Sequence, residues 1–151
     1  MIVLGSDHVG FPLKRKVMEY LEKRGLPFYD VGQFDGEAGD YPVFALKAAR
    51  EVASGKAERG IIFCGTGIGI SIAANKVKGI RCAVCSEPYS ARLSRMHNDG
   101  NMLALGARVV GDELALMIVG EWLDAEFEGE RHLRRVNQIR EIEDKGEISG
   151  F

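Results

Sequence analysis

Short apolar runs alternate along this chain with longer segments in which apolar residues recur every three or four positions. The longer segments have the period of helices with one apolar face; Leu13, Val17 and Leu21, for example, are four residues apart. This alternation is typical of βαβ units, so we expect an α/β fold with a parallel sheet that helices cover on both faces. The short runs predict five strands, at Ile2–Gly5, Leu26–Val31, Gly60–Cys64, Arg81–Cys85 and Met102–Leu105.

Three segments stand outside this alternation. Gly32–Gly39 (GQFDGEAG) is rich in glycine and acidic residues and predicts a loop. Leu114–Leu123 is apolar over more than one stripe of a helix, so we expect cover on two sides, which favours an oligomer interface. An extra C-terminal helix is predicted from about Glu130 to Asp144. Because no strand follows it, it must lie across the body of the domain or on a partner.

Length and charge narrow the class of protein. The 151 residues fit a single domain, 1–151, and we find neither a linker nor an internal repeat. With 20 Lys and Arg against 22 Asp and Glu, the chain lacks the basic surplus typical of proteins that bind nucleic acid or membrane surfaces. We therefore expect neither of those partners.

The cysteines and the N-terminal residues indicate the compartment. Three cysteines form no disulfide framework, which favours a reducing environment. The apolar run Met1–Leu4 is too short for a signal peptide, and no run approaches the ~18 apolar residues that span a bilayer. We expect a cytoplasmic protein.

Polar residues with useful chemistry lie next to three of the predicted strands. Asp7 and His8 follow the first strand, the loop Cys64–Gly69 follows the third, and His97 and Asn98 precede the fifth. Ligands of open parallel sheets bind at the carboxyl ends of the strands. We therefore expect all of these residues along one rim of the sheet, where two histidines with polar neighbours suit proton transfer near neutral pH.

The loop CGTGIGIS has glycines at alternate positions before a predicted helical segment, Ser71–Lys78. Its backbone N–H groups could form a nest that holds an anion, although a glycine turn without any ligand is an equally open reading. The dinucleotide fingerprint G-x-G-x-x-G fails, because the third glycine falls at Gly69 and Ile70 occupies the required place. Cys64, directly before this loop, is either a buried structural thiol or an activated base or nucleophile.

Two other patterns carry competing interpretations. Cys82 and Cys85 form a C-x-x-C, but residues three apart on a strand point to opposite faces and no second pair completes a zinc site, so we expect a structural role. Arg131 and Arg135 are spaced i,i+4 on the last helix and face the same way. They form either a solvated basic face or a phosphate clamp, for which guanidinium pairs are well shaped.

Four blocks of residues, in order over nearly the whole chain, match a known family: Gly5-Ser6-Asp7-His8-x-Gly10-Phe11-x-Leu13-Lys14, Asp40-Tyr41-Pro42, Cys64-Gly65-Thr66-Gly67-x-Gly69-x-Ser71-Ile72-Ala73-Ala74-Asn75-Lys76, and Arg92-x-x-Arg95-x-His97-Asn98. The chain resembles the type B ribose-5-phosphate isomerases, in the family that also holds the galactose-6-phosphate isomerase subunits. The resemblance implies a doubly wound parallel sheet of flavodoxin-like fold, for which we expect the strand order 2-1-3-4-5. It further implies a homodimer or a dimer of dimers, without metal or other cofactor. It also implies that the enzyme interconverts an aldose phosphate and a ketose phosphate through a cis-enediolate.

The resemblance also implies roles for single residues. Cys64 is the expected base, and His97 and Thr66 are expected to open the sugar ring, with Asp7 near the ring oxygen. One branch of the family carries Glu at the position of Ile70 and lacks the cysteine, so this chain fits the thiol mechanism. The enediolate charge would be met by the N–H groups of the loop, at Gly65, Gly67, Ile68, Gly69 and Ser71.

Binding roles follow in the same way. Arg131 and Arg135 match phosphate-binding arginines, with His8 close to the same phosphate, and Tyr41 and Asn98 would contact sugar hydroxyls. Arg108 would reach the phosphate from a neighbouring subunit. In this arrangement one chain supplies Cys64, the loop and the arginine pair, and the other supplies His97, Asn98 and Arg108.

Two alternatives stay open. The same chemistry could act on another sugar phosphate, such as allose, galactose or tetrose phosphate. Val9, Gly39 and the loop Gly32–Gly39 depart from the family pattern beside the expected substrate, so the sugar is undecided. A non-catalytic nucleotide-binding module of flavodoxin-like fold is the alternative from a different class, because a fold alone does not determine function.

Overall fold

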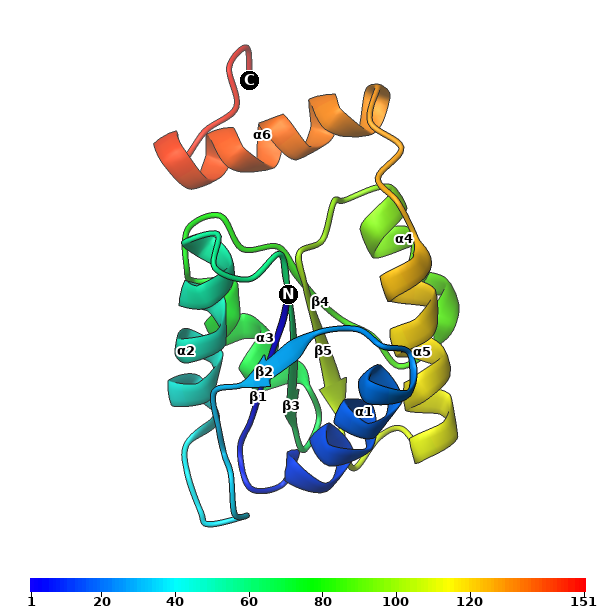
Figure 1. The fold of residues 1–151 in the computed structure, drawn as a ribbon. Coiled ribbons are helices and arrows are strands. Elements are labelled where there is room, and N and C mark those ends of the chain that lie inside the picture. The colour runs from blue at the N-terminus through cyan, green and yellow to red at the C-terminus, as the bar shows by residue number, and fades with distance from the viewer.

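The computed structural model describes all residues, 1–151, and has one five-stranded sheet at its centre (Figure 1). Every pair of neighbouring strands runs parallel, as the alternation of short and long segments predicts. The strands are β1 (Ile2–Ser6), β2 (Phe28–Asp30), β3 (Arg59–Cys64), β4 (Cys82–Val84) and β5 (Met102–Gly106).

Six helices surround the sheet. They are α1 (Phe11–Lys23), α2 (Tyr41–Ala53), α3 (Ile68–Ala74), α4 (Pro88–Met96), α5 (Asp112–Asp124) and α6 (Arg131–Lys145). Helices α2 and α3 cover one face, and α1, α4 and α5 cover the other (Figure 1). The glycine-rich loop enters its helix at Ile68, three residues before the expected start at Ser71. None of the helices is long and apolar enough to cross a membrane.

The strand order is β2-β1-β3-β5-β4, so the expected order 2-1-3-4-5 is wrong for its last two strands. Strand β5 pairs with β3, and β4 lies outside it at the edge. The reason is burial: all five residues of β5 are buried, whereas the three residues of β4 are partly or fully exposed. A short, half-exposed strand suits an edge, and a fully apolar one must be covered on both sides.

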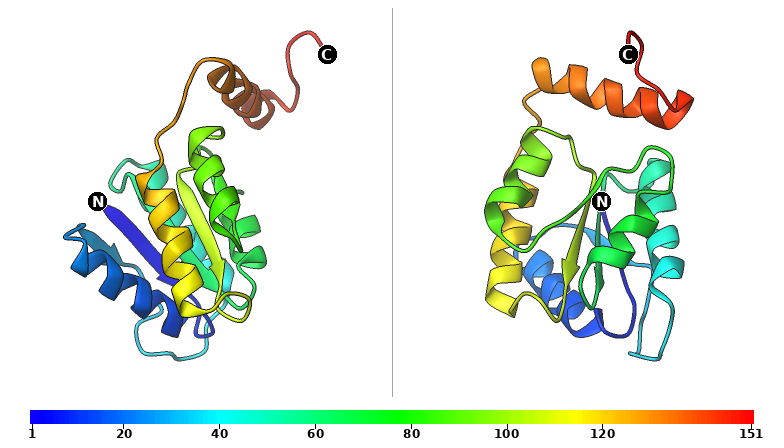
Figure 2. Two further views of the ribbon diagram at one scale, coloured as in Figure 1. Left: turned by 90° about the vertical axis from the view of Figure 1, so that its right-hand side faces the viewer. Right: turned by 180° about the vertical axis from the view of Figure 1, so that it is seen from behind.

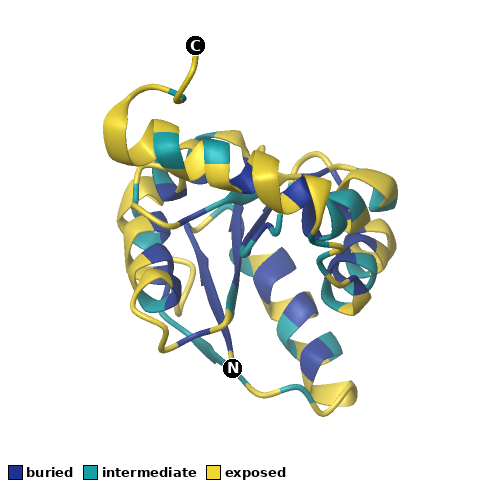
Figure 3. Cartoon of the chain, turned by 90° about the horizontal axis from the view of Figure 1, so that it is seen from above, coloured by how far each residue is buried: buried dark blue, intermediate teal, exposed yellow.

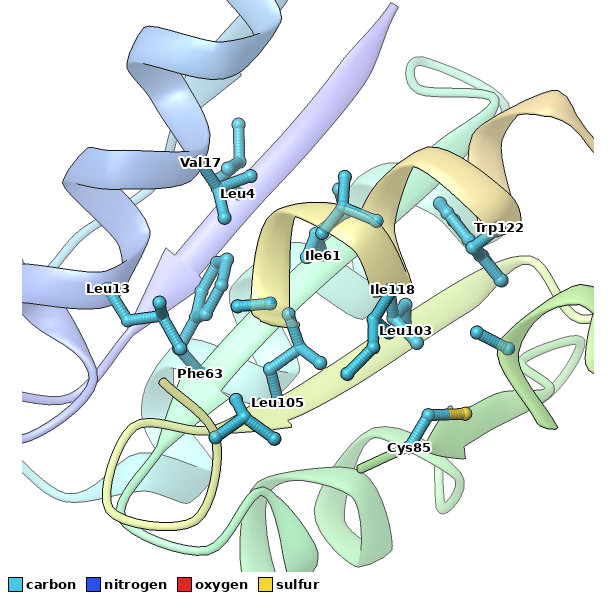
Figure 4. Close-up of a cluster of buried hydrophobic side chains, with 14 of the residues drawn as sticks. Leu4, Leu13, Val17, Ile61, Phe63, Cys85, Leu103, Leu105, Ile118 and Trp122 are labelled. Atoms are coloured by element: carbon cyan, nitrogen blue, oxygen red, sulfur yellow. The ribbon is translucent and has the colours of Figure 1, made fainter. Parts of the chain in front are cut away.

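Side chains of the central strands alternate between two hydrophobic cores. The core under α1, α4 and α5 includes Leu4, Phe63, Leu105 and Trp122 (Figure 4). Cys85 belongs to this core and Cys82 packs against the opposite one, which confirms that the two thiols point to opposite faces. Burial raises the pKa of both thiols, to about 11 for Cys85. Because the two thiols lie at cores on opposite faces of the sheet, they are not placed to form one disulfide or to bind one ion together.

The apolar helix α5 packs between α1 and α4 of its own chain. Its second apolar side is therefore largely covered within the monomer; Tyr20 of α1, for instance, lies so close to Gly120 that a Cβ added there would be 2.7 Å from the tyrosine oxygen. Leu114 and Met117 remain exposed. The apolar pattern of Leu114–Leu123 predicts a helix that is buried on two sides, and this is confirmed. Both sides are covered mainly by helices of the same chain, so the pattern does not by itself indicate an oligomer interface.

Helix α6 crosses the edge of the sheet at which the strands begin (Figure 2). Seen from above, most of its surface is exposed (Figure 3), and only His132 and Val136 are buried. Two contacts anchor its far end, because Glu143 accepts hydrogen bonds from the Gly79 N–H and Lys78 pairs with Asp144 at 2.7 Å. The predicted C-terminal helix is thus confirmed, and of its two expected positions, across the domain or on a partner, these contacts show the first.

Candidate active site

Cys64 ends β3 with its side chain buried, at the carboxyl edge of the sheet. The chain then turns back on itself, so that the N–H of Gly67 donates to the Cys64 sulfur over 3.2 Å. This turn requires glycine: Gly67 has a left-handed φ of 77°, and an added Cβ would lie 2.9 Å from the backbone of Leu105. The loop therefore presents a thiol with a fixed hydrogen-bond donor.

The loop holds several more backbone donors, and some are already used. The N–H of Ile68 donates to the Thr66 hydroxyl over 3.2 Å, and that of Ser71 donates to the Gly67 carbonyl over 3.2 Å. The Ser71 hydroxyl is also occupied, by the Ile68 carbonyl at 2.7 Å. No protein acceptor binds the N–H groups of four residues, Gly65, Thr66, Gly69 and Ile70. These four, rather than the full run to Ser71, are the donors that remain for an anion.

Asp7 and His8 follow β1 at the same edge. Asp7 is almost fully buried, and its carboxylate accepts a hydrogen bond of 2.8 Å from the N–H of Gly10. His8 is exposed, and its Nδ1 lies 3.4 Å from the N–H of Gly39, at the end of the acidic loop. This contact leaves the Nε2 of His8 as the nitrogen that can donate to a ligand.

Tyr41 and Arg108 complete the carboxyl-edge group. The Tyr41 ring, at the start of α2, packs on the loop so closely that a Cβ on Gly69 would lie 2.7 Å from it. The exposed Arg108 forms no ion pair, and its N–H donates to the Gly65 carbonyl over 2.9 Å. Arg108 and His8 line the same surface pocket of about 440 Å³.

Arg108 therefore belongs with Cys64 of its own chain, and the expectation that it reaches the site from a neighbouring subunit is wrong. The reason is its position directly after β5, which pairs with β3 so that Cys64 lies opposite Gly106. Residues that follow two paired parallel strands must meet at one edge.

His97 and Asn98 lie at the opposite edge of the sheet, so the prediction of a single rim is wrong. They come after α4 and before β5, and a segment that precedes a parallel strand lies at the edge where strands begin. Asn98 is exposed beside a pocket of about 500 Å³, which lies between α6 and the body and contains none of the carboxyl-edge residues. Arg81 holds the turn, since its guanidinium donates to the carbonyls of Asn98 and Asp99.

Arg131 and Arg135 lie on this second edge as well, on the exposed side of α6, and neither forms an ion pair. The expected grouping of this arginine pair with Cys64 in one chain is therefore wrong, because α6 and the loop after β3 lie at opposite ends of the strands (Figure 1). The predicted residues form two sets: Asp7, His8, Tyr41, Cys64, Thr66, the loop and Arg108 at the carboxyl edge, and His97, Asn98, Arg131 and Arg135 at the amino edge.

His132 and Glu128 are partners of His97 that the sequence did not reveal. The imidazole rings of His97 and His132 stack with centroids 4.1 Å apart and 7° between their planes. Glu128 lies 3.2 Å from the Nε2 of His132 and 3.9 Å from that of His97. Burial lowers the pKa of His132, and the positive charges around it lower it further. The i,i+4 spacing of Glu128 and His132 was visible, but their proximity to His97 arises only from the fold.

The two edges offer complementary chemistry. The carboxyl edge has a thiol beside unoccupied N–H donors, which suits proton abstraction next to a carbonyl and stabilisation of the resulting oxyanion. The amino edge has an imidazole and two unpaired guanidinium groups, which suit proton transfer and binding of a phosphate.

Comparison with known proteins agrees with this chemistry. The model of one protein family, Ribose/Galactose Isomerase, matches residues 2–139. The chain is 56% identical over 144 residues to ribose-5-phosphate isomerase B of Escherichia coli strain K12, covering 95% of this chain and 97% of that one. It is 46% identical over 140 residues to D-erythrulose-4-phosphate isomerase of Pectobacterium atrosepticum, covering 91% of each.

Solved structures extend the similarity to the fold. Ribose-5-phosphate isomerase B of Clostridium thermocellum superposes with a TM-score of 0.94 at 59% identity, covering 96% of this chain and 98% of that one. The enzyme of the same name from Mycoplasma genitalium, crystallised with bound ribulose 5-phosphate, gives a TM-score of 0.91 at 39% identity, covering 95% and 96%. With one family model over nearly its whole length and such close relatives, the chain belongs to the ribose/galactose isomerase family.

Proposed function

We propose that this protein is an aldose–ketose isomerase that converts D-ribose 5-phosphate to D-ribulose 5-phosphate through a cis-enediolate. The observation that carries the proposal is the Cys64 thiol, buried at the end of β3 and bonded by the Gly67 N–H beside four unoccupied N–H groups. The identity of 56% to a ribose-5-phosphate isomerase B supports the choice of pentose, and with it a place in pentose phosphate metabolism.

In the proposed reaction Cys64 acts as the base. Its thiolate takes the proton from C2 of the open-chain aldose, and the electron pair of that C–H bond forms the enediolate while the C1 carbonyl oxygen becomes negatively charged. The unoccupied N–H groups of the loop stabilise this charge. A proton then passes from the C2 hydroxyl to the C1 oxygen, the thiol returns its proton to C1, and the C2 carbonyl of the ketose forms. The two proton transfers leave the overall oxidation state of the sugar unchanged, so the step needs no redox cofactor.

Ring opening precedes this step and needs a separate acid and base. We assign it to His97 and Thr66, with Asp7 near the ring oxygen. The exposed Thr66 and the half-exposed His97 are both accessible to a ligand, and the Asp7 carboxylate is held rigid by the Gly10 N–H. Rigid donors and acceptors favour catalysis because they need no reorganisation in the transition state.

The working enzyme is proposed to be a homodimer whose active sites are shared. One chain cannot bring His97 to Cys64, because they lie at opposite edges of its sheet. A second copy that presents its amino edge to the carboxyl edge of the first would supply His97, Asn98, Arg131 and Arg135, and symmetry would create two such sites. Two such dimers could form a dimer of dimers.

Binding of the substrate follows from the same arrangement. His8 and Arg108 share one pocket and would bind the phosphate from one chain, while Arg131 and Arg135 of the other chain close around it. Tyr41 and Asn98 are placed to contact the sugar hydroxyls. We propose a small sugar phosphate as the ligand of this site, and neither nucleic acid nor a membrane as a partner.

The cytoplasm is the proposed location. All three cysteines are free, and an isomerase that depends on a thiol is best served by a reducing compartment.

A substrate panel tests the proposal. We expect the highest kcat/KM with ribose 5-phosphate among the ribose, allose, galactose and erythrose phosphates. A clear preference for a tetrose phosphate would instead favour the activity in the name of the Pectobacterium relative. A preference for a six-carbon sugar phosphate would favour the galactose branch of the family.

A thermal-shift panel separates the enzyme from a nucleotide-binding module. A ligand at 100 times its Kd stabilises the folded state by ~2.7 kcal/mol, which is visible as a shift in melting temperature. We expect the shift with sugar phosphates and none with mononucleotides or dinucleotides. The reverse pattern, without isomerase activity, would contradict the proposed function.

A further inference from the structure

We propose that His97, Glu128 and His132 form a binding site for Zn²⁺ at the amino edge of the sheet. The two imidazoles and the carboxylate each offer one ligand atom, and these three atoms lie within 4.8 Å of one another. The site would regulate the enzyme and is not needed for its reaction.

The distances are close to those of a zinc centre. Zinc binds imidazole nitrogen at ~2.0–2.1 Å and carboxylate oxygen at ~2.0–2.2 Å in tetrahedral geometry, which places neighbouring ligand atoms roughly 3.3 Å apart. The Nε2 of His132 is already 3.2 Å from Oε2 of Glu128. The Nε2 of His97 is 3.9 Å from the same oxygen, so only His97 has to move closer.

His132 provides a second, independent observation that points to a ligand. It is 5% exposed, and its Nε2 is buried without a hydrogen-bond partner of suitable geometry, although it faces Glu128. Buried polar atoms in native proteins nearly always have a partner. A metal ion between the two side chains would bond to this nitrogen.

The stacked rings define what must change on binding. The nitrogen lone pairs of stacked imidazoles lie in two separate, nearly parallel planes, so they cannot both point at one ion and one ring must turn. His97 is free to do so: it follows the last helical residue of α4, about a third of its side chain is exposed, and its side chain forms no hydrogen bond. Zinc binding therefore requires His97 to leave the stack while His132 stays in place.

The nature of the ligands and charges selects the metal and limits its affinity. Two imidazoles with one carboxylate suit Zn²⁺, whereas Mg²⁺ and Ca²⁺ prefer oxygen ligands. Glu128 is the single carboxylate in the cluster, and the cationic Arg131 and Arg135 lie on the same helix as His132. Their charge weakens binding, so the ion should exchange with the solvent rather than remain bound permanently.

The consequence for activity rests on the proposed function. If His97 opens the sugar ring in the partner's site, an ion that takes its lone pair prevents proton transfer, and zinc inhibits isomerisation reversibly. Zinc would then reduce turnover through His97, separately from any binding of zinc to the Cys64 thiol.

The test measures binding first, by titrating the full-length protein with Zn²⁺ against a chromophoric zinc indicator. Every protein in the test carries Cys64→Ser, so that the thiol cannot bind the ion. The variants are His132→Gln and Glu128→Gln, and the matched control is His8→Gln, the third histidine, at the opposite edge. Loss of an outer-shell partner already costs roughly 10–100-fold in metal affinity, so loss of a ligand should cost about 100-fold or more.

Two further measurements make the result independent of folding and of activity. His132→Phe keeps an aromatic ring against His97 but has no nitrogen, and it should lose zinc affinity while unfolding at a temperature close to that of the parent. In the parent, zinc should shift the NMR signals of both the His97 and the His132 rings, and Mg²⁺ should shift neither. Unchanged affinity in His132→Phe, or equal losses in His8→Gln, would overturn the zinc site.

Activity of the protein with intact Cys64 separates the two proposals. Two results together support both the site and the role of His97. Zinc should inhibit the protein with Glu128 in a way that EDTA reverses, and it should leave the rate of Glu128→Gln close to that variant's rate without zinc. Tight binding at these residues with full activity would support the site but contradict the role of His97 in catalysis. Inhibition that persists in Glu128→Gln and His132→Phe would overturn the regulatory site.

Discussion

The backbone N–H of Gly67 points at the sulfur of Cys64 from 3.2 Å, three residues further along the chain. The contact exists because Gly67 adopts a left-handed conformation that folds the loop back over the end of β3. A donor in this position stabilises negative charge on the sulfur, and the four unoccupied N–H groups nearby do the same for an oxyanion of the substrate. Thiol base and oxyanion donors are thus built from one short loop.

Replacing Cys64 with Ala should nearly abolish isomerisation while binding of a substrate-like phosphate persists. The thiol is needed for proton transfer, whereas the anion is bound by arginines and N–H groups. Steady-state kinetics and binding of inorganic phosphate measure the two effects separately. Turnover close to the wild-type rate would remove Cys64 from the mechanism.

The other two cysteines are the controls. Cys82→Ala and Cys85→Ala should retain most of the activity, because these thiols lie in the two cores on either side of β4. Thiol alkylation should inactivate the wild type, and substrate should protect it.

Arg131→Ala and Arg135→Ala should each reduce kcat/KM for ribose 5-phosphate by about 1.5–3 kcal/mol, or roughly 10- to 150-fold. This is the strength of a hydrogen bond between charged groups. Arg108→Ala should behave in the same way, because this guanidinium also forms no ion pair. Rates with unphosphorylated ribose, measured at high enzyme concentration, should barely change. Equal losses on both sugars would indicate a structural role instead.

Mixing two inactive variants should restore activity if the site is shared between chains. In a mixed dimer of Cys64→Ala and His97→Asn chains, one site has both defects and the other has none. Random pairing makes about half of the dimers mixed, so about a quarter of all sites should regain full activity. Differently tagged chains show whether subunits have exchanged.

Mixing Cys64→Ala with different second variants tests which residues come from the same chain as Cys64. Arg135→Ala should restore activity when mixed with it, because Arg135 lies at the opposite edge from Cys64. Arg108→Ala should not, because Arg108 and Cys64 lie at one edge of the same chain and both mixed sites would be damaged. Failure of the first pair after confirmed exchange would refute the shared site.

Stability should depend on the charge of Glu87 at the start of α4. Its carboxylate accepts the N–H of Ser90 at 3.0 and 3.1 Å, and this hydrogen bond lowers the pKa of Glu87 in the folded state. A lowered folded-state pKa contributes stability above the ordinary value of 4.5, and this contribution is lost as the pH falls through the folded-state pKa. Glu87→Ala should therefore lower the urea midpoint at pH 7, and the difference from wild type should shrink as the pH falls below 4.5 and through the folded-state pKa of Glu87.

Glu126→Ala, which removes an exposed carboxylate without a hydrogen bond, is the control for net charge. Should both variants show the same dependence on pH, the effect would come from overall charge and not from the helix cap.

Local patterns were enough to predict the elements of the fold and the chemistry of single residues. The period of four residues in Leu13, Val17 and Leu21 depends only on helix geometry, and all three are buried in α1 as expected. The position of Cys64 at the end of an apolar strand, before alternating glycines, likewise follows from the order of residues alone. These features are local, because neighbours in the chain decide them.

Contacts between distant segments were decided by the tertiary structure. The fully apolar β5 takes the central place beside β3 and leaves the half-exposed β4 at the edge, a choice that depends on the burial of whole strands. That pairing brings Arg108 to Cys64, while the direction of the chain through α4 and α5 carries His97, His132 and the arginine pair to the other end. The sequence alone determined which residues carry a thiol, an imidazole or a guanidinium group suited to this chemistry. The tertiary structure decided which of these residues lie close together. It did so because strand pairing and packing between residues far apart in the chain determine which of the two sheet edges each residue occupies.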